Sequence, residues 1–208
     1  MGKVIALLQK KGGAAKTTTA INLLGILLEK GFSAVLCDMD REKPDACFWA
    51  DNGDDLVEHV IPLIEENPTK KIGQLKAKHD FVLIDTPPNF EAAALKAAML
   101  CDITIIPCSS SLLDRNALED AAACAMMANK PYIFLASRVM KRTKGTNDLL
   151  AELKSTGTSF STYITNNVAM LDCQKSGTWV GKYAPQMLNH KQYNELANEL
   201  LEFLGVPV

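Results

Sequence analysis

Hydrophobic residues in this chain gather in short uninterrupted runs, and longer segments with helical spacing of hydrophobic residues lie between them. The runs predict strands at residues 4–8, 34–37, 81–84, 103–106, 132–136 and 163–164. The segments between them predict helices at residues 17–30, 44–50, 91–100, 117–127, 147–155 and 191–204. Apolar strands separated by helices indicate a parallel sheet, because right-handed crossover connections place helices over both faces. We therefore expect an α/β fold with a doubly wound, mainly parallel sheet, and the least regular segment is 51–78.

Length and composition narrow the class of protein. The 208 residues fit one domain over 1–208, and 48% hydrophobic with 22% charged residues is typical of a globular chain. No run reaches the roughly 18 apolar residues of a membrane-spanning helix, and the run at 4–8 is too short for a secretion signal. The formal net charge of −2 does not by itself indicate a nucleic-acid binder. Single cysteines without a Cys-x-x-Cys pair indicate reduced, buried thiols in the cytoplasm: Cys37, Cys47, Cys101, Cys108, Cys124 and Cys173.

The segment between the first predicted strand and helix carries the first candidate chemistry. It reads Gln-Lys-Lys-Gly-Gly-Ala-Ala-Lys-Thr-Thr over residues 9–18. A glycine pair between a strand and a helix lets backbone N–H groups turn toward phosphate oxygens, beside the positive end of the helix. Lys16 would then bind the terminal phosphates, and the Thr17 hydroxyl would coordinate Mg²⁺. Because Lys10 and Ala15 occupy the outer glycine positions of the pattern G-x-x-x-x-G-K-[ST], a plain strand-to-helix turn is the alternative.

Two later strands each run into carboxylates. Asp38 and Asp40 follow the strand at 34–37, and Asp85 opens an Asp-Thr-Pro-Pro sequence after the strand at 81–84. The carboxyl ends of parallel strands form the ligand-binding edge of such a sheet. An acid in the position of Asp85 holds Mg²⁺ directly or through water in P-loop NTPases. Each acid has the alternative of capping a helix N-terminus, but a phosphate loop and two acidic strand ends together favour a nucleotide site.

These motifs in this order resemble the ParA-type ATPases of the deviant Walker A group, which also contains MinD and the nitrogenase iron protein. The group signature K-G-G-x-x-K-[ST] matches residues 11–17, and the D-x-D and D-T-P-P elements follow at 38–40 and 85–88. Pro107 closes the next strand as in the family. Residues 177–185 match the family's G-x-x-V-x-x-Y-A-P stretch, so the resemblance extends along the whole chain. It implies a P-loop NTPase fold.

The resemblance also implies roles for individual residues. The protein would bind ATP with Mg²⁺ and form a homodimer with two nucleotides at the interface, and its hydrolysis would be slow until a partner protein stimulates it. Lys11 would reach the second nucleotide in trans, as an arginine finger does, and Asp40 would position or activate the attacking water. The catalytic candidates are thus Lys11, Lys16 and Asp40. The nucleotide-binding candidates are Lys11, Gly12, Gly13, Ala14, Ala15, Lys16, Thr17 and Thr18. Thr17 and Asp38 would organise Mg²⁺, with Asp85 in its outer shell.

In ParA proteins the ATP-bound dimer binds DNA without sequence preference, and a ParB-like or other adaptor stimulates hydrolysis and release. The resemblance therefore implies a nucleoid-associated protein that partitions plasmid or chromosome DNA. Phosphate contacts would need a local cluster of cations, for which the candidates are Lys141, Arg142, Lys144, Lys175, Lys182 and Lys191. Each of them has the alternative of being a solvated surface residue. Arg138, which follows the predicted strand at 132–136, is a further cation, with a place near the adenine as an alternative role. No helix-turn-helix segment precedes the phosphate loop, so we do not expect sequence-specific operator binding.

Other functions within the group stay open. A MinD-like membrane ATPase would need a basic amphipathic C-terminal helix, whereas residues 194–204 are amphipathic but acidic, so no membrane partner is expected. Close relatives position protein assemblies such as carboxysomes. An iron–sulfur relative would need cysteines that meet across the dimer, and Cys101 and Cys108 lack the family context for that.

The sequence departs from the family pattern in two places. Ala15 stands where the family has glycine, and its Cβ would crowd the phosphates or cost about 1–2 kcal/mol if the backbone needs a positive φ. A nucleotide-dependent binding module with impaired hydrolysis is therefore a further alternative. Arg41 and Glu42 stand where the family commonly has Pro-Gln after the second aspartate, which affects the contacts that position the water.

Overall fold

In the computed structural model, which describes residues 2–88, 91–109 and 114–207, a parallel sheet forms the centre of the chain. Its strand order is β3-β2-β4-β1-β5-β6, and every neighbouring pair in that order is parallel. The strands are β1 (Lys3–Leu7), β2 (Ala34–Asp38), β3 (Val60–Pro62), β4 (Phe81–Asp85), β5 (Ile103–Cys108) and β6 (Tyr132–Ala136). The expected doubly wound α/β fold is confirmed.

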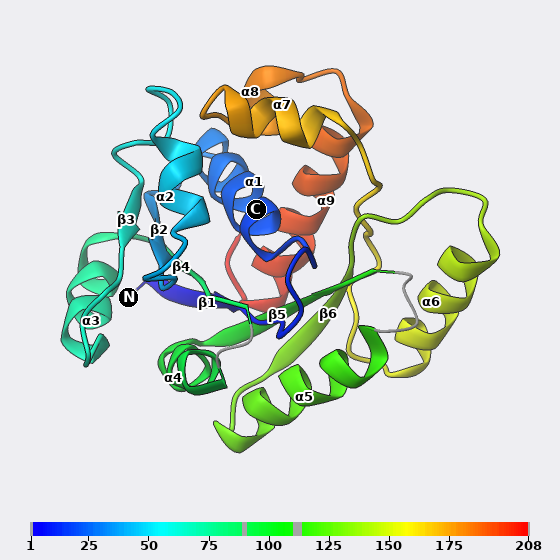
Figure 1. Cartoon of the computed structure of the whole chain (residues 1–208), viewed down its shortest axis with the longest axis horizontal. Coiled ribbons are helices and arrows are strands. Elements are labelled where there is room, and N and C mark those ends of the chain that lie inside the picture. The colour runs from blue at the N-terminus through cyan, green and yellow to red at the C-terminus, as the bar shows by residue number, and fades with distance from the viewer. Residues whose placement is uncertain (1, 89–90, 110–113, 208) are drawn as a thin grey trace.

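Helices cover both faces of this sheet (Figure 1). They are α1 (Lys16–Glu29), α2 (Asp45–Ala50), α3 (Thr69–Lys78), α4 (Glu91–Leu100), α5 (Asp114–Met127), α6 (Lys144–Ser155), α7 (Ala169–Lys175), α8 (Val180–Tyr183) and α9 (Leu188–Phe203). Successive side chains of a strand point to opposite faces, and two hydrophobic cores follow from that rule. Ile5 and Leu7 of β1 pack in the core formed with α1, α2 and α9, whereas Val4 and Ala6 pack in the core formed with α3 to α6.

The hydrophobic pattern predicted most of these elements. Five of the predicted strands correspond to β1, β2, β4, β5 and β6, and all six predicted helices are present with ends shifted by up to three residues. Pro107, expected to close its strand, is followed by one more strand residue, Cys108. This difference is small, because β5 pairs with β1 only over residues 103–105, so the missing N–H of Pro107 disturbs no bond to β1.

The prediction was wrong in two segments. Residues 163–164 form no strand; Phe134–Ser159 and Val139–Thr165 make only isolated bridges beside β6. The segment 51–78, read as irregular, contains β3 and α3. Pro62 is the last residue of β3, an edge strand, where a missing N–H is tolerated. Pro68 directly precedes α3, where the helix needs no donor. The short helices α7 and α8 were not predicted either.

Two distant turns interlock on the α1 side of the sheet. Gly177, between α7 and α8, has φ +61, and a Cβ there would lie 2.1 Å from the backbone N of Gly53, which follows α2. Beside this contact, the Trp49 indole N–H donates to the Thr178 carbonyl over 2.8 Å. Only glycine permits so close an approach of two backbones, so the turn after α2 is fixed to the C-terminal segment.

The apolar face of the C-terminal helix α9 packs into the protein core. Tyr193, Leu196 and Leu200 are at most 1% exposed and belong to the core that includes α1. Of the helices in the described residues, none is long and apolar enough to cross a bilayer.

Candidate nucleotide and cation site

The loop between β1 and α1 has the shape of a phosphate loop. Gly13 and Ala15 adopt left-handed backbone conformations, with φ of +77° and +69°, and α1 begins at the next residue, Lys16. Ala15 is the N-cap of α1 and supplies no side-chain capping bond. Among the described residues, none accepts a hydrogen bond from the N–H of Ala14 or Ala15. The loop therefore presents unpaired N–H groups next to the positive end of a 14-residue helix, which favours an anion.

Pairing between β2 and β4 brings the two acidic strand ends together. Asp38 and Asp85 are register partners at the carboxyl ends of these strands, and they are 1% and 4% exposed. The Thr17 hydroxyl donates to Asp85 Oδ2 over 2.5 Å, whereas no described residue hydrogen-bonds to the buried Asp85 Oδ1. Burial, opposed by the Thr17 bond and reinforced by the charge of Asp38, raises the pKa of Asp85 to about 7. An unpaired oxygen in a buried acidic pair fits a bound cation.

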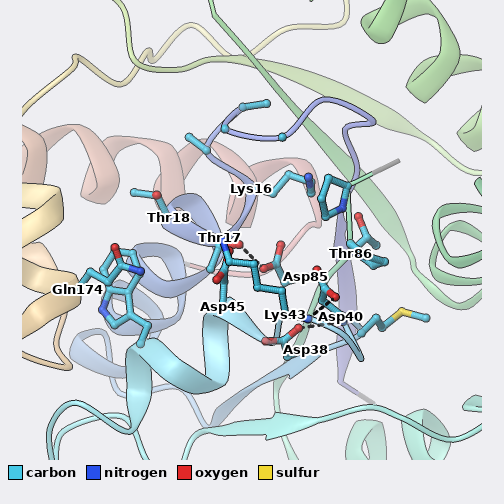
Figure 2. A pocket seen from close by; sticks show the side chains of 18 of the residues that line it. Lys16, Thr17, Thr18, Asp38, Asp40, Lys43, Asp45, Asp85, Thr86 and Gln174 are labelled. Carbon is cyan, nitrogen blue, oxygen red and sulfur yellow. Dashed lines mark hydrogen bonds and ion pairs between the residues drawn. The ribbon is translucent and has the colours of Figure 1, made fainter. Parts of the chain in front are cut away.

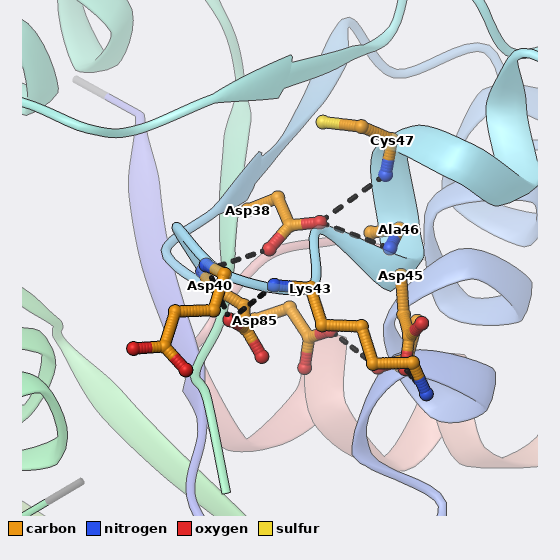
Figure 3. A network of polar contacts seen from close by, with 9 residues as sticks. Asp38, Asp40, Lys43, Asp45, Ala46, Cys47 and Asp85 are labelled. Atoms are coloured by element: carbon orange, nitrogen blue, oxygen red, sulfur yellow. Dashed lines mark hydrogen bonds and ion pairs between the residues drawn. The ribbon is translucent and has the colours of Figure 1, made fainter.

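Asp38 is held by backbone N–H groups (Figure 3). Its Oδ2 accepts from the N–H groups of Ala46 and Cys47 at 2.9 and 3.2 Å, and its Oδ1 accepts from the N–H of Asp40 at 3.0 Å. The capping role that the sequence left open for an acid is therefore present, because Asp38 satisfies the first turn of α2 from outside that helix. Burial raises the pKa of Asp38, and the three backbone bonds counteract that rise. These bonds occupy both lone pairs of Oδ2 and one lone pair of Oδ1, so one lone pair of Oδ1 remains for a further ligand.

Asp40 is partly buried and forms a local turn. Its Oδ1 accepts from the N–H groups of Glu42 and Lys43 at 3.1 and 2.9 Å. This Asx-type turn fixes the direction of the carboxylate, and Asp40 lines the same cavity as Asp38 and Asp85. Its predicted role toward water stays a prediction. Arg41, one of the two departures from the family pattern, donates to the Ile64 carbonyl and so joins this loop to the segment after β3.

A cavity of about 1400 Å³ collects these groups (Figure 2). Residues 12–18 of the loop line it together with Asp38, Asp40 and Asp85, so the structure brings these predicted residues together. Lys11, predicted to act in trans, does not line it. Lys16 lies 6% exposed in the wall, and burial, opposed by the charges of Asp85, Asp40 and Asp45, lowers the pKa of its ammonium group. A desolvated cation beside unpaired N–H groups is suited to a multiply charged phosphate.

The cation candidates are consistent with this arrangement. No group of three or more His, Cys, Asp or Glu side chains suited to a metal occurs within the described residues. Mg²⁺ commonly takes one or two carboxylates and completes its shell with phosphate and water. Thr17, Asp38 and Asp85 fit that requirement, because the unpaired Asp85 oxygen lies beside the Thr17 hydroxyl. None of the described cysteines forms a disulfide, and Cys47 and Cys124 are half-buried rather than buried as expected.

The sequence reading missed the far wall of the cavity except for Arg138, for which it gave a place near the adenine as an alternative. It is formed by residues 164–168 and by residues of α7, including Met170, Leu171 and Gln174. Ser137 and Arg138, directly after β6, complete it, and the structure places Arg138 beside the phosphate loop, where its Nη1 donates to the Gly13 carbonyl. The signal for this wall was the position of residues 137–138 at the carboxyl end of a predicted strand.

The predicted DNA-contacting cations lie on, or just before, four different helices, α6 to α9. Arg142 and Lys144 are exposed at the start of α6, and Lys191 lines a groove of about 310 Å³ together with Lys141. Lys175, Lys182 and Lys191 each lie near an acid, at 3.8 Å from Asp172, 3.5 Å from Asp55 and 3.8 Å from Glu195. Exposed pairs of this kind are weak, so they do not prevent contacts with phosphate.

Comparison with known proteins agrees with this geometry. The model of a family described as an AAA domain matches residues 2–68, which include the phosphate loop and both Asp38 and Asp40. A "Maintenance of carboxysome distribution protein A" from Gloeobacter kilaueensis is 31% identical over 150 residues, covering 69% of this chain and 66% of the relative's length. The "Chromosome-partitioning ATPase Soj" of Treponema pallidum is 22% identical over 250 residues, covering 97% of this chain and 98% of that protein.

Solved structures share the fold. The septum site-determining protein MinD of Pyrococcus horikoshii, complexed with Mg-ADP, superposes with a TM-score of 0.81 at 18% identity and covers 99% of this chain and 98% of its own. At that identity the likeness concerns the fold alone. Together with the deviant Walker A sequence at 11–17 and the buried acidic pair, the family model and the sequence relatives identify the chain as a member of the ParA/MinD group of P-loop ATPases, and the MinD structure agrees with them in fold.

Proposed function

We propose that this protein is an ATP-dependent switch that dimerises around ATP and positions DNA, or an assembly carried along DNA, with the help of a partner protein. The observation that carries the proposal is the buried Asp85 oxygen without a partner, next to Thr17 and the N–H groups of the phosphate loop. A polar atom in that state fits a site completed by a cation and a phosphate. The name of the Soj relative and the Mg-ADP bound to the MinD structure support the same reading.

The chain's own residues divide the binding of Mg-ATP among them. The loop N–H groups and Lys16 bind the phosphates, and Thr17, Asp38 and Asp85 hold Mg²⁺. The cation would offset the charge that develops on the phosphates during hydrolysis. Asp40, fixed by its own turn at the cavity wall, positions or activates the attacking water.

Lys11 acts on the second nucleotide of the dimer. It lies in the loop but outside the cavity lining, as expected of a group that serves another subunit. We expect Lys11→Ala to keep appreciable ATP binding and to lose ATP-dependent dimerisation and turnover. Lys16→Gln is the matched control, because it removes a cation of the same loop and should abolish binding itself. An unchanged sedimentation coefficient of Lys11→Ala with ATP would exclude the role in trans.

Asp40 has a separate test. Asp40→Ala should trap an ATP-bound dimer, because the water that attacks the phosphate is no longer positioned. Undiminished turnover of this variant would exclude the assignment.

DNA binding belongs to the dimer in this proposal and uses cations of the C-terminal segment. Lys175→Glu together with Lys182→Glu should weaken DNA binding without changing nucleotide affinity, and should reduce the salt dependence by about one unit of slope per lost phosphate contact. Lys70→Glu together with Lys78→Glu is the matched control, since these exposed lysines lie on α3 and the charge change is the same. An equal effect of both pairs would show a nonspecific effect of charge.

Two specific observations keep second candidates open. The name of the carboxysome-distribution relative favours a protein assembly as the cargo, for which the partner rather than the ATPase would decide. The positive φ of Ala15 favours a binding module in which dimerisation persists but turnover is impaired.

The deciding experiment measures DNA binding and oligomer size in the same samples, with ATP, with ADP and without nucleotide, on two unrelated duplexes. Binding of both duplexes by a dimer only with ATP would support the proposed switch. Dimerisation with ATP but no DNA binding would contradict the DNA part of the proposal and favour a protein surface as the target. No response to nucleotide would contradict the proposal as a whole.

A further inference from the structure

The two residues that follow β6 are bonded to the phosphate loop. The Arg138 guanidinium donates from Nη1 to the Gly13 carbonyl over 2.7 Å. The Ser137 hydroxyl lies 3.3 Å from the Ala14 carbonyl and 3.2 Å from the Cys108 carbonyl, so its single hydrogen is shared between them. Two consecutive carbonyls of the loop are thus tied to the end of a strand more than 120 positions away in the chain.

These two bonds determine where the loop N–H groups point. In a trans peptide the carbonyl of one residue and the N–H of the next lie in one plane and point in opposite directions. Fixing the Gly13 carbonyl on Arg138 therefore sets the direction of the Ala14 N–H. Fixing the Ala14 carbonyl on Ser137 sets that of the Ala15 N–H. No described residue accepts a hydrogen bond from either of these N–H groups.

The loop needs such restraint because of its own sequence. Ala15 has φ +69, a region that an alanine leaves readily when nothing holds it there. Arg138 itself has φ +52, so Arg138 and Ala15 both adopt a backbone conformation that residues with a Cβ disfavour. Strained residues persist where the surrounding structure over-determines them, and the bonds from residues 137 and 138 are that surrounding structure.

We propose that Ser137 and Arg138 are positioning residues, which hold residues 12–15 in the phosphate-receiving conformation and offset the alanine at position 15. The predicted effect of Ser137 and Arg138 on nucleotide affinity rests on the proposed function, whereas their predicted effect on the loop conformation does not. A direct contact between Arg138 and the nucleotide is the competing explanation, since Arg138 also lines the cavity. The two explanations differ in whether the effect of Arg138 depends on residue 15.

The test is a double-mutant cycle between Arg138→Met and Ala15→Gly in the full chain, read by hydrogen exchange of the nucleotide-free loop and by Mg-ADP affinity. With Ala15 present, Arg138→Met should speed exchange of the amides of residues 12–16 about tenfold and weaken Mg-ADP binding about tenfold. In the Ala15→Gly background both effects should fall to about twofold, because glycine occupies the left-handed region without restraint. Arg138→Lys, which keeps a cationic N–H donor group, should stay within about threefold of the native protein.

Lys96→Met is the matched control. Lys96 also lines the cavity and also donates to a backbone carbonyl, that of Glu66, but it does not touch the loop. It should leave loop exchange unchanged. Equal losses of affinity from Arg138→Met in both backgrounds, or unchanged loop exchange, would overturn the proposal. If the native protein does not bind Mg-ADP, the proposed function fails. The hydrogen-exchange measurement then still decides by itself whether Arg138 restrains the loop.

Discussion

Replacing Ala15 by glycine should stabilise the protein, although glycine usually destabilises a folded chain. Ala15 has φ +69 and ψ +27 at the N-cap of α1. The left-handed region costs an L-residue with a Cβ about 1–2 kcal/mol, and glycine is free of that cost. Glycine also loses more backbone freedom on folding, which costs about 0.4–1 kcal/mol relative to alanine. The midpoints of these two ranges predict a gain of about 0.8 kcal/mol for Ala15→Gly.

The gain is measurable by thermal and urea unfolding of the nucleotide-free protein. For a chain of this size, it corresponds to a rise in Tm of about 1–4 °C. Ala14→Gly is the matched control, because Ala14 is the adjacent residue, is 4% exposed and does not have a positive φ. It should destabilise by about 0.5–1 kcal/mol, since glycine gains nothing there. Destabilisation of similar size by both substitutions would refute the reasoning that position 15 is strained.

Three further perturbations test other parts of the structure. Burial lowers the pKa of His190, but the Pro185 carbonyl and the Glu29 carboxylate outweigh burial and raise that pKa above 6.5. The protonated His190 therefore stabilises the fold at low pH, and this contribution is lost as the pH rises through the pKa of the folded state. His190→Gln should therefore lower the urea midpoint more at pH 6 than at pH 9, and equal losses at both would contradict this. Gly177→Ala should destabilise the protein by clearly more than the roughly 1 kcal/mol expected of Gly157→Ala. Both glycines have a positive φ, but of the two only Gly177 has backbone atoms where a Cβ would lie. Equal unfolding free energies of the two variants would show that the contact between the interlocked turns does not stabilise the fold. Asp85→Asn should stabilise the protein in EDTA by on the order of 1 kcal/mol, because it removes a buried negative charge that no cation neutralises there. The same variant should lose the added stability that Mg-ADP gives the native protein. Destabilisation of the variant in EDTA would contradict the cation site.

The sequence alone determined the class of fold. Continuous apolar runs, such as the one that became β4, are buried on both faces and need no knowledge of their neighbours to be recognised. The signal failed where an element was short or its period was weak. Residues 163–164 look like a strand but hydrogen-bond to the end of β6 only at isolated points, and β3 is three residues long. Such segments are defined by what they pack against rather than by their own residues.

The site was divided in the same way. The order of glycines, lysines and threonine along residues 9–18 determined a phosphate loop, because the local chain conformation and the chemistry come from adjacent residues. Only the tertiary structure decided that Asp38 and Asp85 are neighbours, since that depends on β2 pairing with β4 across 47 positions. It alone also decided that Ala15 is left-handed and that Arg138 holds the loop. Contacts between distant segments follow from the packing of the whole sheet, and no local pattern records them.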